Sequence, residues 1–544
     1  MGIPSYFSYI IKNHSNIIRN LNYHQNINKT SFRHLYIDAN SIIYDAYRLL
    51  EKDTENLNKM DKIEIEKRII EQVIVNLKKY IVFIKPTTTI FIGFDGVAPF
   101  AKMEQQRTRR YKSDFMTTVS FNKNTIQPPK STWNTTAITP GTNFMNTLSQ
   151  TIIYEFMHKE CLYGVSQIIV TPSIDPGEGE HKLYEHVRNH ISIADTVAVY
   201  GLDSDLIMLS IFHLKYCKNI YIFREAPEFA NSIIKIDNTS IKLPLFLNID
   251  LLVKSITNEM DCKCPDPHRA NDYVFLCFFL GNDFLPHFPA LNIRTNGIQI
   301  LLDTYRMFIG NKPDRFLISK SQQIEWRNVR ILLEEIAKNE KGYITTEYSL
   351  RDKLEYKKYE QTSEKERENY FNSVPVIFRV DEKYIAPNEL NWEDRYYKIL
   401  LHETREKNAI KTICNNYLEG LEWVFKYYTA GCPHWKWKYN YHYPPLLVDL
   451  VTYVPHYNTE FIQKNDSKPF SPYTQLSYVL PKSQFELLPK QISTYLLDKF
   501  PHLYSSHLEF QWAFCRYFWE CHIRNTPIPL TILENWDKNF GKLG

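Results

Sequence analysis

The sequence predicts an α/β protein whose mainly parallel sheet is flanked by helices, and three observations support this fold class. Short apolar or β-branched runs alternate with helical patterns over the first 300 residues. Hydrophobic residues make up 44% and charged residues 23% of the 544 residues, proportions typical of a globular chain with a large core. Carboxylates follow several of the apolar runs, and parallel sheets bind ligands beyond the carboxyl ends of their strands.

The strands are expected where apolar runs end at a turn residue or a carboxylate, namely 35–38, 89–94, 167–171 and 196–201. Apolar spacing of three and four residues predicts helices between and after them, at 62–80, 143–158, 182–191 and 272–280. The order strand, helix, strand predicts parallel neighbours joined by crossovers. Asp38, Asp95 and Asp203 then lie near one edge of the sheet.

Beyond this region the composition changes twice. Residues 338–368 are dominated by Lys, Glu, Arg and Tyr, which is typical of a solvated helix or a linker. After residue 391 the chain becomes rich in aromatic side chains, and 421–428 reads as a buried helix. We therefore expect three parts: a catalytic region over 1–337, a charged linker over 338–390, and a second region over 391–544 that closes the active-site pocket.

Net charge, cysteine content and apolar stretches exclude several protein classes. The net charge is only +4, and nine cysteines form no regular framework, so we expect reduced thiols in a soluble, intracellular protein. The longest apolar stretch, near 273–280, is far shorter than the roughly 20 residues that span a bilayer. Cys262, Cys264 and His268 lack the spacing of a zinc loop, so no zinc is expected.

Acidic residues in distinctive contexts form the first candidate site. Two pairs are spaced i, i+2, which in an extended segment places both side chains on one face. Carboxylates that converge on one cleft repel each other unless hard divalent cations neutralise them. The pattern indicates Mg²⁺ or Mn²⁺, with two ions clamping a phosphodiester. The alternative for any single residue is a helix cap or a turn. The candidate metal ligands and catalytic residues are Asp38, Asp95, Glu178, Glu180, Asp203, Asp205 and Asp283.

Glycine is scarce, with 16 residues, so each is expected where the backbone requires it. Seven lie beside these motifs: Gly93, Gly96, Gly141, Gly177, Gly179, Gly201 and Gly281.

A basic stretch follows Asp95 directly. If residues 99–112 are helical, one stripe of hydrogen-bond donors projects from that helix. Arg offers bidentate geometry to a phosphate, and Lys a point charge. In isolation a solvated basic helix would explain the pattern; beside candidate metal ligands it indicates phosphate binding. The stripe consists of Lys102, Gln106, Arg109 and Arg110.

Ten motifs resemble, in chain order, those of the Xrn/Rat-type 5′→3′ exoribonucleases. The first conserved region of that family is matched by residues 1–7 (MGIPSYF), 36–43 (YIDANSII), 94–103 (FDGVAPFAKM), 105–110 (QQRTRR), 138–142 (ITPGT), 176–182 (PGEGEHK), 200–206 (YGLDSDL) and 281–287 (GNDFLPH). Residues 418–423 (LEGLEW) and 435–445 (WKWKYNYHYPP) resemble the second conserved region.

The resemblance implies a PIN/5′-nuclease-like catalytic domain with an aromatic-rich, mostly helical second region. It implies a Mg²⁺-dependent, processive enzyme that removes nucleotides one by one from single-stranded RNA with a 5′-monophosphate, in RNA turnover. By this similarity the seven carboxylates bind metal and the stripe from Lys102 to Arg110 forms the 5′-phosphate pocket. A short member that ends at the catalytic core is expected, as a monomer without membrane partners and cytoplasmic rather than nuclear.

The sequence departs from the family at several positions. Tyr44 stands where a base-stacking His is usual, and Ser41 replaces a Gly. Residues 516–519 (RYFW) replace a segment that contains Gly and Lys. The resemblance places one indole of the 435–445 stretch opposite Tyr44, so Trp435 and Trp437 are both candidates. We expect one of them in the core and favour Trp437 for stacking.

Two other functions remain open at this point. A DNA-directed 5′ nuclease of the flap-endonuclease type has a similar metal site, although the aromatic second region argues against it. A non-catalytic RNA-binding scaffold is the other alternative, and the intact carboxylates argue against that.

Overall fold

The structure is a computed structural model that describes residues 3, 5–20, 31–57, 59–123, 133–226, 244–505, 507–524 and 526–540. Met1, Gly2 and Pro4 of the first motif lie outside these residues. In the described part of the chain, no helix is both long and apolar enough to cross a membrane.

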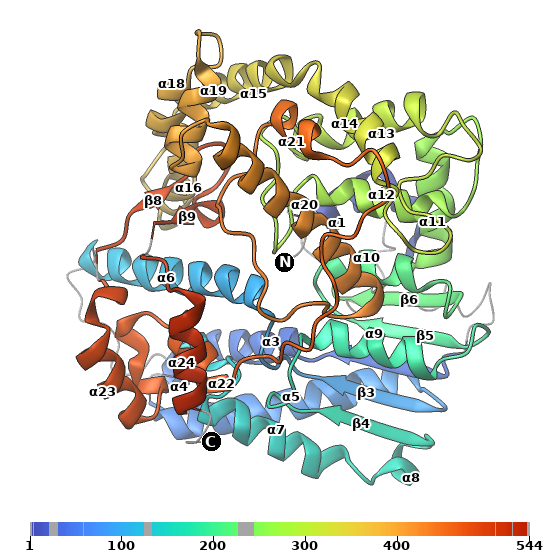
Figure 1. Cartoon of the computed structure of the whole chain (residues 1–544). Coiled ribbons are helices and arrows are strands. Elements are labelled where there is room, and N and C mark those ends of the chain that lie inside the picture. Colours follow the sequence, from blue (N-terminus) through green and yellow to red (C-terminus); the bar gives the residue numbers. More distant parts are fainter. Residues whose placement is uncertain are drawn as a thin grey trace.

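A seven-stranded sheet forms the centre of the first region, in the order β1-β7-β6-β5-β2-β3-β4 (Figure 1). Neighbouring strands from β6 to β4 run parallel, whereas β7 pairs antiparallel with both β6 and β1. This mixed but mainly parallel sheet confirms the predicted fold class. The strands are β1 (Ile18–Asn20), β2 (His34–Asp38), β3 (Thr89–Gly93), β4 (Gln167–Thr171), β5 (Thr196–Tyr200), β6 (Asn219–Arg224) and β7 (Leu245–Asn248).

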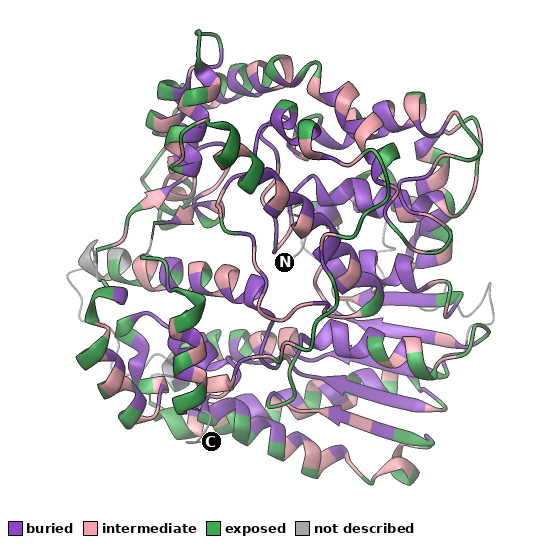
Figure 2. Ribbon diagram, viewed as in Figure 1, coloured by how far each residue is buried: buried purple, intermediate pink, exposed green. Residues whose placement is uncertain are grey.

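Alternating side chains of the central strands contact different helical layers. Leu35 and Ile37 of β2 belong to a core formed with one set of helices, whereas Tyr36 between them belongs to the core on the other face. Both faces are therefore buried, as parallel sheets require (Figure 2). The first layer contains α3 (Asn40–Glu51), α5 (Lys62–Ile84) and α7 (Asn143–Phe156), and the second contains α9 (Gly179–His190), α10 (Asp205–His213), α11 (Ile249–Met260) and α12 (Arg269–Phe278).

The second layer continues without a break into the helical remainder of the chain. One core cluster contains Val199 of the sheet together with Trp326, Trp423 and Phe514. The helices beyond the sheet are α13 (Gly297–Phe308), α14 (Trp326–Ala337), α15 (Glu340–Glu355), α16 (Glu364–Asn372), α17 (Val374–Ile377), α18 (Val380–Ile385), α19 (Trp392–Tyr396), α20 (Lys407–Ala430) and α21 (Leu447–Tyr453).

A separate cluster joins the start of the long helix α6 (Phe100–Lys123) to the C-terminal helices. These helices are α22 (Pro472–Val479), α23 (Lys490–Lys499) and α24 (Leu530–Phe540), and Figure 1 shows them beside α6. The short strands β8 (Phe510–Gln511) and β9 (His522–Ile523) pair antiparallel, and β9 contacts α6. The remaining short helices are α1 (Tyr6–Asn13), α4 (Thr54–Leu57) and α8 (Glu160–Tyr163).

All four predicted strands and all four predicted helices are present, with ends shifted by a few residues. One premise was wrong. The i, i+2 pairs do not lie in extended segments: Glu178 is the N-cap of α9 and Glu180 lies in its first turn, while Asp205 begins α10. Carboxylates are favoured there because the first backbone amides of a helix are unpaired.

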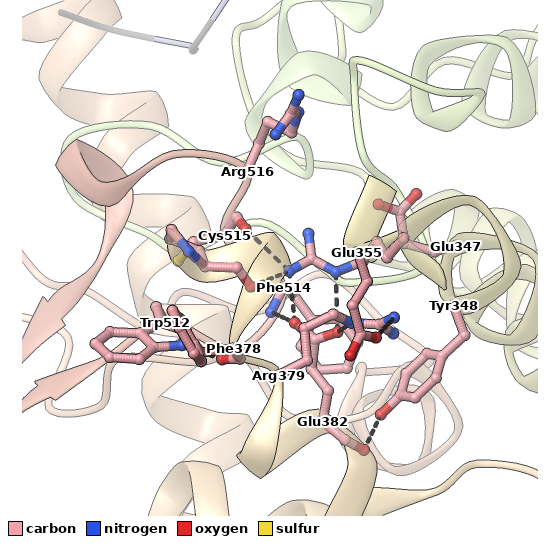
Figure 3. A network of polar contacts seen from close by, with 12 residues as sticks. Glu347, Tyr348, Glu355, Phe378, Arg379, Glu382, Trp512, Phe514, Cys515 and Arg516 are labelled. Carbon is pink, nitrogen blue, oxygen red and sulfur yellow. Dashed lines mark hydrogen bonds and ion pairs between the residues drawn. The ribbon is translucent and has the colours of Figure 1, made fainter. Parts of the chain in front are cut away.

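The segment expected as a charged linker, 338–390, contains α15 to α18 and a buried ion-pair network (Figure 3). Arg351 Nε donates to Glu382 Oε2 at 2.9 Å, and Arg379 Nε donates to the same oxygen at 2.6 Å. The side chains of Glu382 and Arg379 are fully buried. Charged composition here reflects internal pairing as well as solvation. The division into three domains stays a prediction.

A buried histidine connects α9 and α10, and four of the candidate carboxylates lie at the N-terminal ends of these two helices. His213 at the end of α10 is fully buried, and its Nδ1 lies 2.6 Å from the carbonyl oxygen of Leu209. Its Nε2 lies 3.0 Å from a guanidinium nitrogen of Arg188 on α9. The ring must be neutral to donate to the carbonyl and accept from Arg188. Burial lowers the pKa of His213 to about 3.

This histidine predicts an acid sensitivity of folding. The unfolded chain protonates His213 below about pH 6.5, whereas the folded protein does not until about pH 3, so stability falls as the pH drops through this window. Between pH 6.5 and 5 the free energy of unfolding should decrease by about 2 kcal/mol from this residue. Urea titrations across this range should show a shallower decrease for His213→Gln. An unchanged pH dependence in that variant would contradict the assignment.

Candidate active site

Six of the seven candidate carboxylates begin or follow elements of the sheet and its second layer. Asp38 ends β2, Asp95 follows β3, and Glu178 with Glu180 begins α9. Asp203 and Asp205 lie between β5 and the first turn of α10. The seventh, Asp283, comes from the turn after α12. This turn requires Gly281, whose φ is +85° and whose missing Cβ would lie 2.8 Å from the amide nitrogen of His287.

Three carboxylates form one group that could hold a metal ion. Among the described residues, one oxygen each from Asp38, Asp95 and Glu180 lies within 4.8 Å of the others. Asp95 is oriented by the backbone amide of Gly179 at 2.6 Å and by the side-chain amide of Asn40. Carboxylate oxygens are the ligands that Mg²⁺ and Mn²⁺ prefer.

Backbone geometry brings the helix N-terminus up to this group. A Cβ at position 179 would lie 3.0 Å from Asp38 Oδ1 and 3.4 Å from Asp95 Oδ1, so glycine allows the close approach. Asp38 Oδ1 is buried and has no hydrogen-bond partner in the described structure. A buried acceptor oxygen without a donor is costly, and a cation would satisfy it. The residues present therefore fit a divalent ion.

The electrostatics of the group are those of crowded, buried carboxylates. Burial, together with the charges of Asp95 and Asp203, raises the pKa of Asp38 well above its usual value. Burial and the neighbouring Glu178 do the same to Glu180, raising its pKa well above the usual value. Burial also raises the pKa of Asp205 to about 7. The group holds more negative charge than the protein alone compensates.

Lys102 provides the cation that the protein itself places among these carboxylates. Its Nζ lies 2.6 Å from Glu178 Oε1 and 2.6 Å from Asp283 Oδ2. Gln105 donates to the other oxygen of Asp283 at 3.0 Å, and the Tyr427 hydroxyl donates to Glu178 at 2.9 Å. Although burial opposes charge, the Lys102 ammonium holds the pKa of Asp283 well below its usual range.

The four side chains of the basic stripe on α6 therefore do not share one environment. Lys102 lies among the carboxylates, whereas the exposed Arg109 lines a chamber described below. Arg110 donates to Thr139 Oγ1 at 2.7 Å, and Gln106 is half-buried between them with its carbonyl oxygen unpaired. Arg107, which was not a candidate, is buried with its guanidinium 5.0 Å from the ring centre of Tyr478. Only part of the stripe is free to meet a phosphate.

The aromatic candidates occupy different environments. Trp437 is only 8% exposed and stacks on Trp423, with ring centres 5.4 Å apart, which is the core role expected for one of the two indoles. Trp435 is half-buried beside Gly177 in a different cavity. Tyr44 is half-buried on α3. Exposure therefore favours Trp435 over Trp437, and which indole stacks on a base stays a prediction.

A chamber of about 480 Å³ lies between α6 and the helical region, next to the carboxylates. Asp283 and Arg109 line it, and Tyr441, Tyr517 and Trp519 contribute aromatic rings. Trp519 is 48% exposed, and its ring stacks on that of Tyr517 with centres 4.2 Å apart. These two rings were not among the site residues predicted from the sequence. The sequence did contain a signal for them. Residues 516–519 read Arg-Tyr-Phe-Trp, and this departure from the family's usual segment places one Arg beside three aromatic residues.

The Cys262, Cys264 and His268 group has other partners. His268 Nε2 lies 2.9 Å from the carbonyl oxygen of Ile318, and Cys264 Sγ lies 3.8 Å from the carbonyl oxygen of Asn311. Both contacts are hydrogen bonds to backbone carbonyl groups of the folded chain.

Comparison with known proteins extends these observations. Residues 1–226 match the family model described as "XRN 5'-3' exonuclease N-terminus", and residues 268–391 and 384–527 match the one described as "Xrn1 helical domain". The chain is 25% identical to 5'-3' exoribonuclease 2 of Debaryomyces hansenii, covering 92% of this chain and 65% of that protein. It is 24% identical to 5'-3' exoribonuclease 1 of Saccharomyces cerevisiae, covering 92% and 40%, and 26% identical to that of Homo sapiens, covering 90% and 31%. The chain thus spans less than two thirds of each of these relatives.

Proposed function

The chain belongs to the XRN 5′-3′ exonuclease family, and from this membership we propose that it is a 5′→3′ exoribonuclease. The proposed substrate is single-stranded RNA with a 5′-monophosphate, and the products are mononucleotides. The observation that supports this most is the buried carboxylate group near Lys102, whose ion-pair partner Asp283 lines a chamber with aromatic and cationic side chains. The relatives compared above carry the same activity in their names.

Asp38, Asp95 and Glu180 would hold a divalent cation, and Glu178, Asp203, Asp205 and Asp283 complete the acidic surroundings of a second. Such ions, when bound, polarise a phosphodiester and activate water. The chain itself orients the acidic groups: Asn40 and Gly179 fix Asp95, while Lys102 and Tyr427 fix Glu178. The chamber, which Asp283 lines, offers rings on which bases stack.

One gel assay tests the proposal. A 5′-monophosphorylated, 3′-labelled RNA should be shortened from its 5′ end only when Mg²⁺ or Mn²⁺ is present, and a flapped DNA should persist. Cleavage of the DNA in preference to the RNA would contradict the proposal and favour a flap-endonuclease-type nuclease. Binding without cleavage under all metal conditions would favour a non-catalytic scaffold.

We expect a preference for the 5′-monophosphate end that depends on Arg109. This guanidinium is exposed, lines the chamber beside Asp283, and forms no ion pair within the described structure. Losing a charge-assisted contact costs about 1.5–3 kcal/mol, so Arg109→Ala should reduce the preference for monophosphate over hydroxyl ends roughly ten- to a hundredfold. Relative kcat/KM on the two RNAs measures this. Arg68→Ala, an exposed arginine on α5, is the matched control. An equal preference in Arg109→Ala and wild type would assign Arg109 another role.

A further inference from the structure

A second cavity of about 560 Å³ lies immediately outside the chamber. It is lined by residues 357–360, which follow α15, by α16 with Ser373 after it, and by Arg516, Tyr517 and Trp519. Tyr517 and Trp519 line both cavities, so this ring pair forms a wall that they share. We call this second cavity the outer groove. The lining of the chamber, which includes Asp283, therefore meets the lining of the outer groove at these two rings.

The outer groove carries cations that the protein does not neutralise. Lys357, Lys358 and Arg516 line it, and none of them forms an ion pair with a carboxylate in the part of the chain described. Of the two acidic residues in the lining, Glu366 accepts hydrogen bonds from the backbone amides of Thr362 and Ser363 in a capping box. The other acidic residue in the lining is Glu360, so one further carboxylate faces these three cations.

Two polar atoms in this lining are buried without partners in the described structure, the hydroxyl of Tyr359 and Nη1 of Arg516. The Arg516 guanidinium also lies over the Tyr517 ring, 4.8 Å from its centre. Unpaired cations beside rings are the combination with which proteins bind single-stranded nucleic acid, because phosphates meet the cations and bases stack on the rings.

The shared wall is held in place by the network of Figure 3. Arg351 Nη2 donates to the carbonyl oxygen of Cys515 at 3.0 Å, and Glu382 accepts the amide of Phe514 at 2.8 Å. Phe514 has a φ of 62°, a left-handed conformation that is rare for an aromatic residue. The buried ion pairs thus fix the backbone that presents Tyr517 and Trp519.

We propose that the RNA strand trailing the nucleotide under attack follows this path, from the chamber past Tyr517 and Trp519 into the outer groove. Its phosphates there meet Lys357, Lys358 and Arg516. The inference rests on the proposed function and adds to it an extended substrate path outside the catalytic group. Affinity then depends on substrate length, because only a strand long enough to leave the chamber reaches the outer groove.

Binding of RNA measured without divalent cations tests this path independently of cleavage. The probes are 5′-monophosphorylated oligouridylates of about 4 and about 16 nucleotides, the range that single-strand sites cover. Lys357→Ala combined with Lys358→Ala should weaken binding of the long RNA roughly tenfold and of the short RNA less than twofold. For the long RNA, the slope of log affinity against log salt should decrease by about 1.4, because each phosphate contact contributes about 0.7.

The matched control is Lys67→Ala combined with Lys79→Ala, two exposed lysines of α5 that line neither cavity. An equal loss for both RNA lengths, an unchanged salt slope, or the same decrease in the control would overturn the path. Failure of the wild type to bind either RNA would instead overturn the proposed function itself, and the path with it.

Discussion

Asp38→Asn should abolish RNA hydrolysis while leaving the protein folded and able to bind RNA. Asp38 offers an unpaired, buried oxygen to the group formed with Asp95 and Glu180, so its loss removes a ligand at the centre of the proposed metal site. We expect kcat to fall by at least roughly a thousandfold, about 4 kcal/mol in activation free energy. Single-turnover degradation of 5′-monophosphorylated RNA measures this, beside an affinity measurement.

The same substitution should stabilise the metal-free protein. The pKa of Asp38 is raised by burial and by neighbouring carboxylates, so an uncharged isostere removes an unfavourable charge. Asp498→Asn, at an exposed position on α23, is the control for a lost carboxylate outside the group. If Asp38→Asn retained wild-type activity with Mg²⁺, the assignment of this group would be wrong.

Lys102→Met should destabilise the metal-free protein by about 3–5 kcal/mol, because it leaves the buried carboxylates of Glu178 and Asp283 without their shared cation. Urea unfolding in the presence of a chelator measures the loss. Added Mg²⁺ should restore part of it, since a ligand that binds only the folded state raises stability. Lys102→Arg, which keeps the charge, should lose less.

This result separates two roles for Lys102. A residue that only bound the substrate phosphate would reduce the preference for a 5′-monophosphate when replaced, and would leave stability unchanged. Unaltered unfolding of Lys102→Met would therefore return Lys102 to the phosphate stripe predicted from the sequence.

The parts of the fold that local pattern determines could be predicted. Strands such as 89–93 are continuous apolar runs because both faces are buried, and α5 repeats apolar residues at helical spacing. The edge strand β1 has only three residues, and its pairing with β7 joins segments more than 200 residues apart. No local pattern encodes such a partner.

In the candidate site too, the residues that local motifs identify could be predicted, and the contacts between distant segments could not. The carboxylates follow strands or begin helices, so a run of short motifs identifies them. The position of Lys102 depends on Asp283 and Glu178, which come from distant segments, so helical periodicity alone could not predict its ion pairs with them. Trp519 and Tyr517 form part of the chamber only because Arg351 and Glu382 anchor the preceding backbone.

Because one core joins the sheet to the helical region, the chain cannot be cut into two separately folded fragments between them. Val199, Trp326, Trp423 and Phe514 belong to one cluster, so cutting after residue 337 would expose apolar faces on both fragments. Neither fragment would retain a complete interior. The two halves should therefore be produced and handled as one polypeptide, and the parts of both halves that share this core should lose structure together.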